Sequence, residues 1–476
     1  MQLKKGEIIE VDIHALAFMG GGIGKYKGGL CKSPTCCDAE KSSVGLTVFV
    51  EKTIPGDKVR ASLTKIKPKF AEAKLVEIVS PSKDRIKPVC KYFGICGGCQ
   101  FQFMSYEKQL EFKKQHVIDA FERIGKIFAP PVLTVIACDD PFYYRNKMEF
   151  SFGYNEKMQF ALGLHLPERR YDILDVDECF LQSKRSVEIF NKVREFAIEH
   201  NWLPYQYSCN KGFLQSLFIR EGKRTGEIMV NLIAAENVGN DWPENLQKDL
   251  EDFVELLKDC DSVYFSKIIN QRGQRKRIEE RLLHGEKTIT EKMILPNGDE
   301  LSFEISPQAF FQVNTLQAEK LYYEVVKMLE EGGHDVIFDL YCGTGTIGLF
   351  LARHCNQVYG IELLPEAVFA ARENARKNKI FNIDFYAGDA AKIVSDLKVR
   401  PSAIVVDPPR AGLTEKLIKE INDFDPKTIV YVSCNPATLA RDCQVFARYN
   451  YKVVKTVPVD MFPQTYHIEN VCLLRR

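Results

Sequence analysis

Two short segments carry the side chains that are best suited to chemistry. Ser433-Cys-Asn-Pro436 follows a strand-like run at 428–432, and Asp339-Leu-Tyr-Cys-Gly-Thr-Gly345 ends another at 336–340. A cysteine at a strand end can bond covalently to a substrate, and paired glycines let the backbone pass close to a nucleotide-like ligand. A cofactor turn and a nucleophile in one half of the chain indicate an enzyme.

The glycine turn predicts a particular cofactor. Its pattern, Asp339-x-x-x-Gly343-x-Gly345, differs from the Gly-x-Gly-x-x-Gly of dinucleotide sites. The next strand ends in Glu362, placed to accept hydrogen bonds from ribose hydroxyls, and the third ends in Gly388-Asp389, where adenine would lie. One glycine turn alone is more often structural, but three strand ends in this order predict S-adenosylmethionine binding.

Cys434 is the candidate nucleophile. An unperturbed cysteine, with a pKa of about 8.5, is only about 3% thiolate at neutral pH and needs activation. Taken alone, Cys434 could equally be a buried thiol. Asp407-Pro-Pro-Arg410 ends the preceding strand and should face the same crevice, which favours a functional role. Few enzymes combine a methyl-donor fold with a cysteine nucleophile, and most of these modify pyrimidine C5.

A second group of cysteines has the spacing of metal ligands. Cys90-x5-Cys96-Gly-Gly-Cys99 places three thiols on one short loop, and Cys179 is a candidate for a distant fourth. The five-residue gap exceeds that of zinc ribbons, so an iron–sulfur cluster is favoured over zinc and over merely buried cysteines. A fourth ligand would make the cluster structural, because radical enzymes leave one iron open.

Composition indicates an ordinary soluble globular protein. Of 476 residues, 45% are hydrophobic and 27% charged, the net charge is +1, and neither a membrane span nor a signal peptide is visible. Fifteen cysteines without an export signal suggest reduced thiols and a cytoplasmic protein. Basic runs at 58–87 and 267–281 suit RNA, although such runs are more often solvated surface.

Periodicity predicts three domains. Short strands with glycine turns predict a small OB-like β-barrel over 1–80, interrupted by a long loop at 31–43. A mixed α+β domain should follow over 81–306, with a helix at 105–124 that can pack on the catalytic domain. Strands alternating with helices over 307–476 predict a Rossmann-like α/β domain whose parallel sheet ends in an antiparallel edge hairpin.

Together these residues resemble the RNA uracil-5-methyltransferases, and most closely the bacterial 23S rRNA branch with an N-terminal TRAM domain and a [4Fe-4S] cluster. The resemblance covers nearly the whole chain and implies a seven-stranded class I methyltransferase domain. The motifs that carry it, in chain order, are Ile54-Pro-Gly-Asp57, Lys69-Phe-Ala-Glu-Ala73, Cys90, Cys96, Cys99, Cys179, Phe311-Gln-Val-Asn314, Asp407-Pro-Pro-Arg-Ala-Gly-Leu413, Ser433-Cys-Asn-Pro436 and His467-Ile-Glu469.

The resemblance also implies roles for individual residues. Cys434 would be the nucleophile that adds to uracil C6, and Glu469 the base that removes the C5 proton, giving 5-methyluridine. The four cysteines at 90, 96, 99 and 179 would hold the cluster. Residues implied to contact the cofactor or the bound uracil are Gln312, Tyr341, Gly343, Gly345, Glu362, Asp389 and Asp407.

The expected partner is RNA with its target base looped or flipped out, because a base inside a duplex cannot be reached. We favour 23S rRNA, with tRNA as the alternative, and expect a monomer. Thr346 stands where some relatives carry a cofactor-contacting asparagine, and the 31–43 loop, with Cys31, Cys36 and Cys37, is not part of the usual barrel.

Rival functions differ at identifiable positions. Cytosine-5 RNA enzymes usually place a cysteine directly after Asp-Pro-Pro, and amino-group methyltransferases an aromatic, where Arg410 stands here. A non-catalytic RNA-binding iron–sulfur protein would need neither Cys434 nor Glu469. Without the family context, Glu469 is typical of a surface carboxylate on an edge strand.

Overall fold

The computed structural model describes residues 3–26, 45–167, 169–206, 208–236, 242–269, 277–295, 297–330 and 332–476. The predicted loop at 31–43, with its three cysteines, lies outside these ranges, as does most of the basic stretch at 271–277. The chain divides into two compact units, Met1–His116 with Phe462–Tyr466 and Val117–Met461 with His467–Arg476. Among the described residues, no helix is both long and apolar enough to cross a membrane.

A closed barrel of five strands forms the start of the first unit, as the sequence predicted. The strands follow the order β1, β2, β3, β5, β4 around the barrel, and β3 and β5 form its parallel pair. Alternate residues point inward, so that Val48 and Val50 of β3 are fully buried. The bounds are β1 Ile8–Leu16, β2 Gly22–Tyr26, β3 Leu46–Val50, β4 Lys58–Ile66 and β5 Phe70–Ser80.

Asp57 ties the turn before β4 to the segment after β5. Its buried carboxylate accepts hydrogen bonds from the amides of Ile54, at 2.8 Å, and Ser82, at 2.9 Å. Arg85 adds two more bonds, from Nη2 at 2.5 Å and from Nε at 3.1 Å. Burial alone would raise the pKa of Asp57, but Arg85 and the two amides outweigh it and lower the pKa. The aspartate of the Ile54–Asp57 motif therefore has a structural role.

Helix α1, Tyr106–Arg123, begins in the first unit and continues into the second. Its first turns bind the segment 462–466, which lies between two C-terminal strands. The Gln109 Nε2 donates to Gln464 Oε1 at 3.0 Å, and the Gln464 amide donates back to Gln109 Oε1 at 3.0 Å. Lys113, fully buried, donates to the Phe462 carbonyl at 3.0 Å. These bonds explain why 462–466 groups with the first unit.

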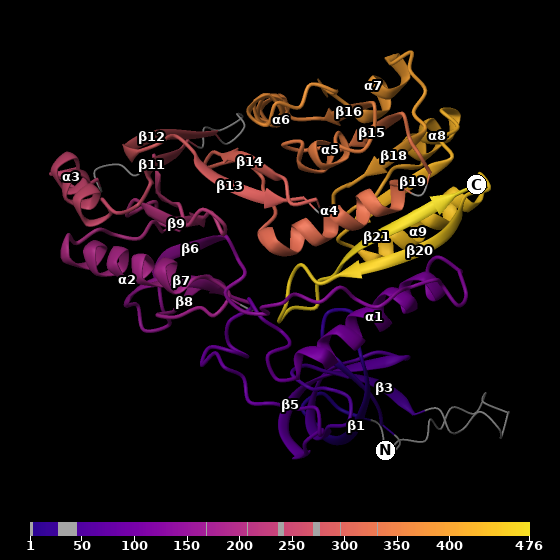
Figure 1. Ribbon diagram of the computed structural model, residues 1–476. Coiled ribbons are helices and arrows are strands. Elements are labelled where there is room, and N and C mark those ends of the chain that lie inside the picture. Colours follow the sequence, from indigo (N-terminus) through magenta and orange to yellow (C-terminus); the bar gives the residue numbers. More distant parts are fainter. Residues whose placement is uncertain are drawn as a thin grey trace. The chain divides into compact units, whose positions relative to one another are not determined.

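The second unit contains two seven-stranded sheets (Figure 1). The first follows the order β12, β11, β10, β9, β6, β7, β8 and is antiparallel except for the parallel pair β10–β11. Its inward strand positions at Met148, Phe150 and Phe152 are buried, as their alternation predicted. The bounds are β6 Lys147–Tyr154, β7 Phe160–Leu166, β8 Arg169–Asp175, α2 Lys184–Glu199, β9 Leu214–Glu221, β10 Ile228–Ala235, α3 Leu246–Leu256, β11 Ser262–Ile269 and β12 Arg277–Gly285.

The C-terminal sheet follows the order β17, β16, β15, β18, β19, β21, β20. The first five strands are parallel and β21 is antiparallel to both neighbours, which confirms the predicted α/β sheet and its final hairpin. A hairpin, β13 Ile289–Ile294 with β14 Glu300–Ile305, and helix α4, Thr315–Glu330, precede it. The remaining bounds are β15 Val336–Leu340, α5 Thr346–Leu351, β16 Gln357–Glu362, α6 Pro365–Lys377, β17 Ile383–Ala387, α7 Ala390–Asp396, β18 Ala403–Val406, α8 Glu415–Asp423, β19 Thr428–Ser433, α9 Pro436–Ala447, β20 Lys452–Val459 and β21 Glu469–Arg475.

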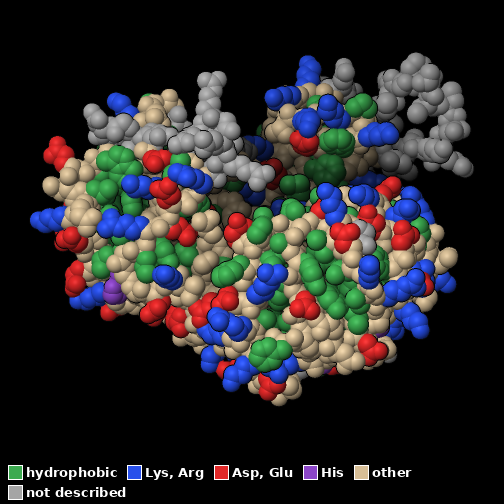
Figure 2. Space-filling view, turned by 90° about the horizontal axis from the view of Figure 1, so that it is seen from above, with side chains coloured by type: hydrophobic (Ala, Val, Ile, Leu, Met, Phe, Trp, Pro, Cys, Tyr) green, Lys and Arg blue, Asp and Glu red, His purple; other side chains and the backbone are tan. Residues whose placement is uncertain are grey.

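Parallel order brings the ends of β15, β16, β18 and β19 to one edge of the sheet. Open α/β sheets bind ligands at this carboxyl edge, near the point where the strand order reverses on either side of β15. Figure 2 shows basic and acidic side chains interspersed on one face of the molecule, in keeping with the near-zero net charge. Since neither charge predominates on this face, the side chains at the sheet edge are the better candidates for the chemistry.

Replacing Asp57 with alanine should destabilise the barrel, because Arg85 and two amides would lose their shared acceptor. We expect the free energy of local opening of strand β3 to fall by about 3 kcal/mol, measured by amide hydrogen exchange. The matched control is Glu77→Gln, which removes an exposed ion pair with Arg60 and should change this free energy by less than about 1 kcal/mol. Equal protection in the Asp57→Ala protein and the wild type would contradict the role given to Asp57.

Candidate active site

The glycine turn after β15 has one face packed and one face open. Gly343 and Gly345 have φ angles of 55° and 82°, in the left-handed region that favours glycine. A Cβ on Gly345 would lie 2.7 Å from the ring of Phe385, whereas one on Gly343 would meet nothing within 4 Å. The backbone at Gly343 is therefore accessible to a ligand, while Gly345 is required by packing. Tyr341, with a φ of 65°, leads into the turn.

Glu362 fastens the end of β16 to this turn. Its two carboxylate oxygens accept hydrogen bonds from the amides of Gly343, at 3.1 Å, and Leu364, at 3.0 Å. Each oxygen keeps a second lone pair for a ligand hydroxyl. Leu363 and Leu364 are 63% and 57% exposed beside it. A carboxylate next to exposed apolar side chains suits a ribose with its attached adenine.

Asp389 has a local structural explanation. Its carboxylate accepts a hydrogen bond from the Lys392 amide at 3.2 Å and caps the N-terminus of α7. The residue is exposed, so the cap does not prevent a contact with a ligand. Its contact with adenine stays a prediction.

Asp339 is a buried carboxyl group beneath the turn. Neither carboxyl oxygen has a hydrogen-bond partner within the described part of the chain, although the Gly348 amide lies nearby. Burial, with a smaller contribution from the charges of Asp407 and Glu362, raises the pKa of Asp339 to about 8. A cationic ligand would relieve this crowding of acids. The sulfonium and ammonium groups of S-adenosylmethionine meet that requirement, so the site fits this cofactor.

Hydrogen bonds around Cys434 fix the turn between β19 and α9. The Ser433 hydroxyl donates to the Asn435 carbonyl at 3.1 Å and accepts from the Asn435 amide at 3.2 Å. The Asn435 side chain caps α9 by accepting from the Ala437 amide at 3.1 Å. It also donates to the Arg410 carbonyl at 3.1 Å, which joins this turn to the Asp407–Leu413 loop. Cys434, half-buried, is held between these contacts.

The environment of Cys434 opposes its ionisation. Burial, followed by the charges of Glu469 and Asp407, raises the pKa of the thiol to about 11, while Arg410 acts in the opposite direction. At neutral pH the thiol is therefore protonated. The strand register agrees with these charge effects, because Val406 pairs with Tyr431 and Ser433 pairs with Asn470, so that Asp407, Cys434 and Glu469 lie at neighbouring strand ends.

Glu469 lies inside the protein. It is the first residue of β21, pairs with Val459 of β20, and is only 5% exposed. The alternative of a surface carboxylate therefore does not apply. Burial and then the charge of Asp407 raise the pKa of Glu469 well above its usual range, opposed by Arg410. Asp407 keeps a little accessible surface, but its carboxyl is deep enough that loss of water raises its pKa to about 7.

Gln312 lies on a segment that is anchored by its backbone. The Gln312 carbonyl accepts from Asn146 Nδ2 at 2.8 Å, and the carbonyl of the next residue, Val313, accepts from the Asn146 amide at 2.8 Å. Asn314 of the same motif donates to the Met461 carbonyl at 3.2 Å. The segment is held firmly, and the half-buried Gln312 side chain stays a predicted ligand contact.

One charged residue near Cys434 escaped the reading of the sequence as a possible functional group. Arg410 served there only to exclude rival enzymes, yet it is the cation that faces Cys434 and Glu469. Its position inside the Asp407–Leu413 motif was the available signal. Thr346, in place of the asparagine of some relatives, lies 3.3 Å from the Tyr322 hydroxyl, so it packs against α4.

The cysteine loop of the first unit has a hydrogen bond to a cysteine sulfur and another from a cysteine amide. The Gly98 amide donates to Cys96 Sγ at 3.3 Å, and the Cys90 amide donates to Gln102 Oε1 at 3.1 Å. Amide bonds to sulfur suit a thiolate ligand. Within the described ranges, no three His, Cys, Asp or Glu side chains are gathered closely enough to hold a metal ion. Cys179 belongs to the second unit, and the three loop cysteines to the first.

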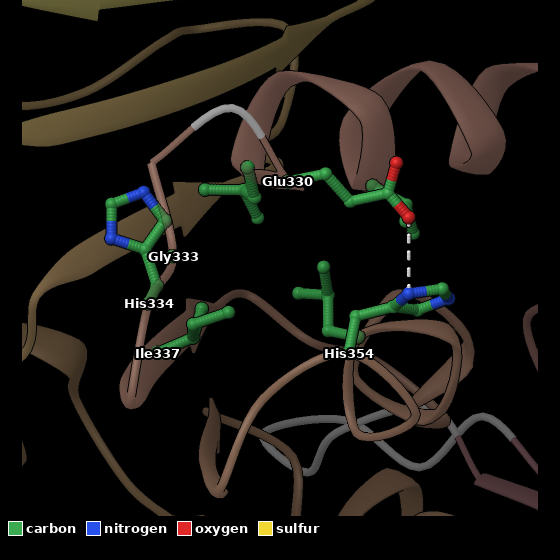
Figure 3. Close-up of a pocket in the computed structure, with 8 residues that line it drawn as sticks. Glu330, Gly333, His334, Ile337 and His354 are labelled. Carbon is green, nitrogen blue, oxygen red and sulfur yellow. Dashed lines mark ion pairs between the residues drawn. The ribbon is translucent and has the colours of Figure 1, made fainter.

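A small pocket of about 160 Å³ lies away from this site (Figure 3). Ile337 near the amino end of β15 lines it, whereas the cofactor turn follows the carboxyl end of that strand. Glu330 pairs with His354 Nδ1 at 3.1 Å, and His334 lies on the opposite side of the pocket. It therefore plays no part in the chemistry of the sheet edge.

Comparisons with known proteins agree with this geometry. Residues 105–476 match the tRNA (uracil-5-)-methyltransferase family and residues 2–76 match the TRAM domain. An uncharacterized RNA methyltransferase of Clostridium acetobutylicum is 37% identical over all of this chain and 98% of its own, and one of Chlorobaculum tepidum is 37% identical over 92% and 93%. The crystal structure of a Pyrococcus abyssi tRNA (uracil-54, C5)-methyltransferase with S-adenosyl-L-homocysteine is 29% identical, with a TM-score of 0.74 over 98% of this chain and all of that one.

The chain therefore belongs to the RNA uracil-5-methyltransferase family. It is an S-adenosylmethionine-dependent RNA methyltransferase with an N-terminal TRAM domain.

Alkylation of Cys434 should depend steeply on pH. Since the thiolate is the reactive form and the pKa of Cys434 is raised to about 11, its reaction with iodoacetamide should be slow at neutral pH and accelerate up to that pH. Peptide mass spectrometry of the ligand-free protein measures the rate at this residue. A rate that levels off below pH 8 would contradict the environment described for the thiol. Cys434→Ser provides the blank for assigning the modified peptide.

Proposed function

We propose that the enzyme methylates uracil C5 in RNA through a covalent bond between Cys434 and C6, with Glu469 removing the C5 proton. The observation that carries this proposal is the meeting of a thiol, two buried carboxyl groups and one guanidinium at the sheet edge that bears the cofactor turn. A nucleophile and a base at one place suit a reaction that needs both.

Cys434 begins the reaction by adding to C6. The S–C6 bond forms as the C5–C6 double bond opens, and its electrons make C5 a nucleophile. Because the thiol is protonated in the resting site, its proton must first pass to water. The charges of Asp407 and Glu469 hold the pKa of the thiol high, so a cation bound beside them favours the thiolate and leaves Glu469 ionised to act as the base.

When bound, S-adenosylmethionine would supply the methyl group that C5 takes up and would leave as S-adenosylhomocysteine. Glu469 then accepts the C5 proton, the electrons of the C5–H bond restore the C5–C6 double bond, and the S–C6 bond breaks to return the Cys434 thiolate. A carboxylate whose pKa is raised is a stronger base, so burial of Glu469 helps this step. Asp407 and Gln312 would hold the base and the cofactor in line.

The geometry of the turn supports the following cofactor contacts. We assign the ribose to Glu362, the adenine to the side of the site bearing Asp389, and the close backbone approach to Gly343, with Gly345 packing behind it. Tyr341 leads into the same turn, and burial raises its pKa, with the charges of Asp389 and Glu362 adding to this. Its hydroxyl therefore stays protonated and can serve as a donor.

We favour 23S rRNA as the substrate, with tRNA as a second candidate. The cysteine loop and the TRAM domain support the first, since the rRNA branch that the sequence resembles carries both features. The second is favoured by the similarity over 98% of the chain to an archaeal enzyme that acts on tRNA uracil 54. Either substrate would be encountered in the cytoplasm by an enzyme that acts as a monomer.

We also propose that Cys90, Cys96, Cys99 and Cys179 hold a [4Fe-4S] cluster. The short loop, the glycines between two of its cysteines and the amide bond to Cys96 Sγ support the first three ligands. With four thiolate ligands the cluster would stabilise the fold and take no part in methyl transfer.

Variants at the two catalytic positions test the reaction. With anaerobically purified protein, S-adenosylmethionine and [5-³H]uridine-labelled 23S rRNA or tRNA, release of tritium reports attack at C5. Cys434→Ala should abolish release, and Glu469→Gln should slow it by about 100- to 10,000-fold while a covalent RNA–protein adduct accumulates. Cys355→Ala, at a half-buried thiol remote from the sheet edge, is the control and should retain activity. Turnover by Cys434→Ala would rule out the covalent mechanism.

Metal analysis tests the cluster separately. Anaerobically purified protein should contain iron and acid-labile sulfide and absorb visible light, and Cys96→Ser should lose all three signals. If the protein instead contains zinc and no sulfide, the cysteines form a zinc site and the cluster proposal is wrong. The absence of any metal from protein made under iron-replete, anaerobic conditions would contradict the proposal. Cys209→Ser, at an exposed thiol, is the matched control.

A further inference from the structure

A buried carboxylate on α9 is bonded to the loop that carries Asp407 and Arg410. Asp442 is only 1% exposed. Its Oδ2 accepts hydrogen bonds from the Leu413 amide at 2.8 Å and from the Tyr431 hydroxyl at 2.7 Å, and its Oδ1 accepts from Arg441 Nε at 2.8 Å. These donors offset the cost of burying the charge. Together they hold the Asp442 carboxylate in a single orientation.

Arg441 also binds the same loop, through hydrogen bonds to its carbonyl groups. Its Nη2 donates to the carbonyls of Ala411, at 2.9 Å, and Leu413, at 3.3 Å. The Arg441–Asp442 pair therefore binds both an amide and two carbonyls of the loop. Nearer the start of α9, Thr438 Oγ1 donates to the Arg410 carbonyl at 3.3 Å, in addition to the bond from Asn435.

The loop approaches this pair so closely that only glycine fits between them. Gly412 has a φ of 76°, and a Cβ there would lie 2.5 Å from Asp442 Oδ2 and 2.6 Å from Arg441 Nη2. This steric observation is independent of the hydrogen bonds. Both show a loop pressed directly against the two charged groups.

The position of the loop matters because of what lies on either side of it. Helix α9 begins two residues after Cys434, and the loop carries Arg410, the cation that faces Cys434 and Glu469. One helix therefore sets the place of the nucleophile and, through Asp442 and Arg441, the place of that cation.

We propose that Asp442 and Arg441 are positioning residues for methyl transfer, which act by holding the 407–413 loop, and with it Arg410, at a fixed place relative to Cys434. The inference rests on the proposed role of Cys434 as nucleophile. Neither residue takes part in the chemistry. Their contribution is to the geometry of the reacting groups, and small displacements of such groups are costly.

Asp442→Asn and Arg441→Met test this role. Asparagine lacks the charge and offers a single acceptor oxygen, so it cannot hold the Leu413 amide, the Tyr431 hydroxyl and Arg441 together. We expect kcat to fall by about 100-fold, with the KM for RNA and for S-adenosylmethionine unchanged. The pH dependence of Cys434 alkylation should move to higher pH, because the Arg410 side chain would be held less closely beside the thiol. A merely structural role would not move that profile.

The controls separate loop position from folding. Asp423→Asn makes the same chemical change at a carboxylate that is 57% exposed on α8, and should match the wild type in both measurements. Arg441→Lys keeps the charge and one donor and should recover part of the activity lost in Arg441→Met. Circular dichroism melting shows which variants are folded. Should Asp442→Asn fail to fold, Arg441→Met carries the test, since that side chain is 46% exposed.

The outcomes are distinguishable. Folded variants with wild-type kcat and an unchanged alkylation profile would overturn the positioning role. Wild-type turnover that survives Cys434→Ala would instead overturn the proposed function on which the inference rests. A lowered kcat with a displaced alkylation profile, in a protein whose turnover requires Cys434, supports both.

Discussion

Crowding of acidic groups at the carboxyl edge of one parallel sheet is the constraint around which this enzyme is organised. The register of β15, β18 and β19 places Asp339, Asp407 and Cys434 at neighbouring strand ends, and β21 adds Glu469. Burial raises the pKa of each of these groups, and repulsion by neighbouring acids adds to this at Asp339, Cys434 and Glu469. For a carboxyl group, a pKa raised by folding reduces stability as pH rises above its unfolded value. This edge of the sheet therefore favours a cation.

The same crowding keeps the Cys434 thiol protonated and therefore unreactive at neutral pH. A thiol with a pKa of about 11 is largely inert toward electrophiles and oxidants at neutral pH. Arg410 is the countering charge on the protein, and its effect depends on where its loop lies. Binding of a positively charged methyl donor would add a second countering charge. Reactivity would thus rise only when the reaction partners are in place, which suits a nucleophile that must spare other electrophiles.

Local pattern was sufficient to predict much of this molecule, and its failures have a common cause. The barrel and the parallel sheet were predictable because neighbouring residues carry the signal. Apolar residues alternate along the strands, as at Val48 and Val50, and glycines mark the turns, as at Gly343 and Gly345. Glu469 was found only through a resemblance, since an edge-strand carboxylate looks the same whether buried or exposed. The Asp442–Leu413 bond and the pairing of α1 with 462–466 join residues far apart in sequence, and nothing local signals them. Position within a known motif would have singled out Arg410.

The threading of residues 462–466 into the first unit has a consequence for how the protein is made. Gln109 and Lys113 are buried, and the partners they have in Gln464 and Phe462 are translated only after nearly all of the second unit. Domains usually fold in the order of their synthesis. Here the N-terminal unit would leave the ribosome without the segment 462–466 that packs against α1, and a nascent chain stalled before residue 462 would lack these bonds. The first unit can therefore form all of its contacts only after nearly all of the second unit has been synthesised.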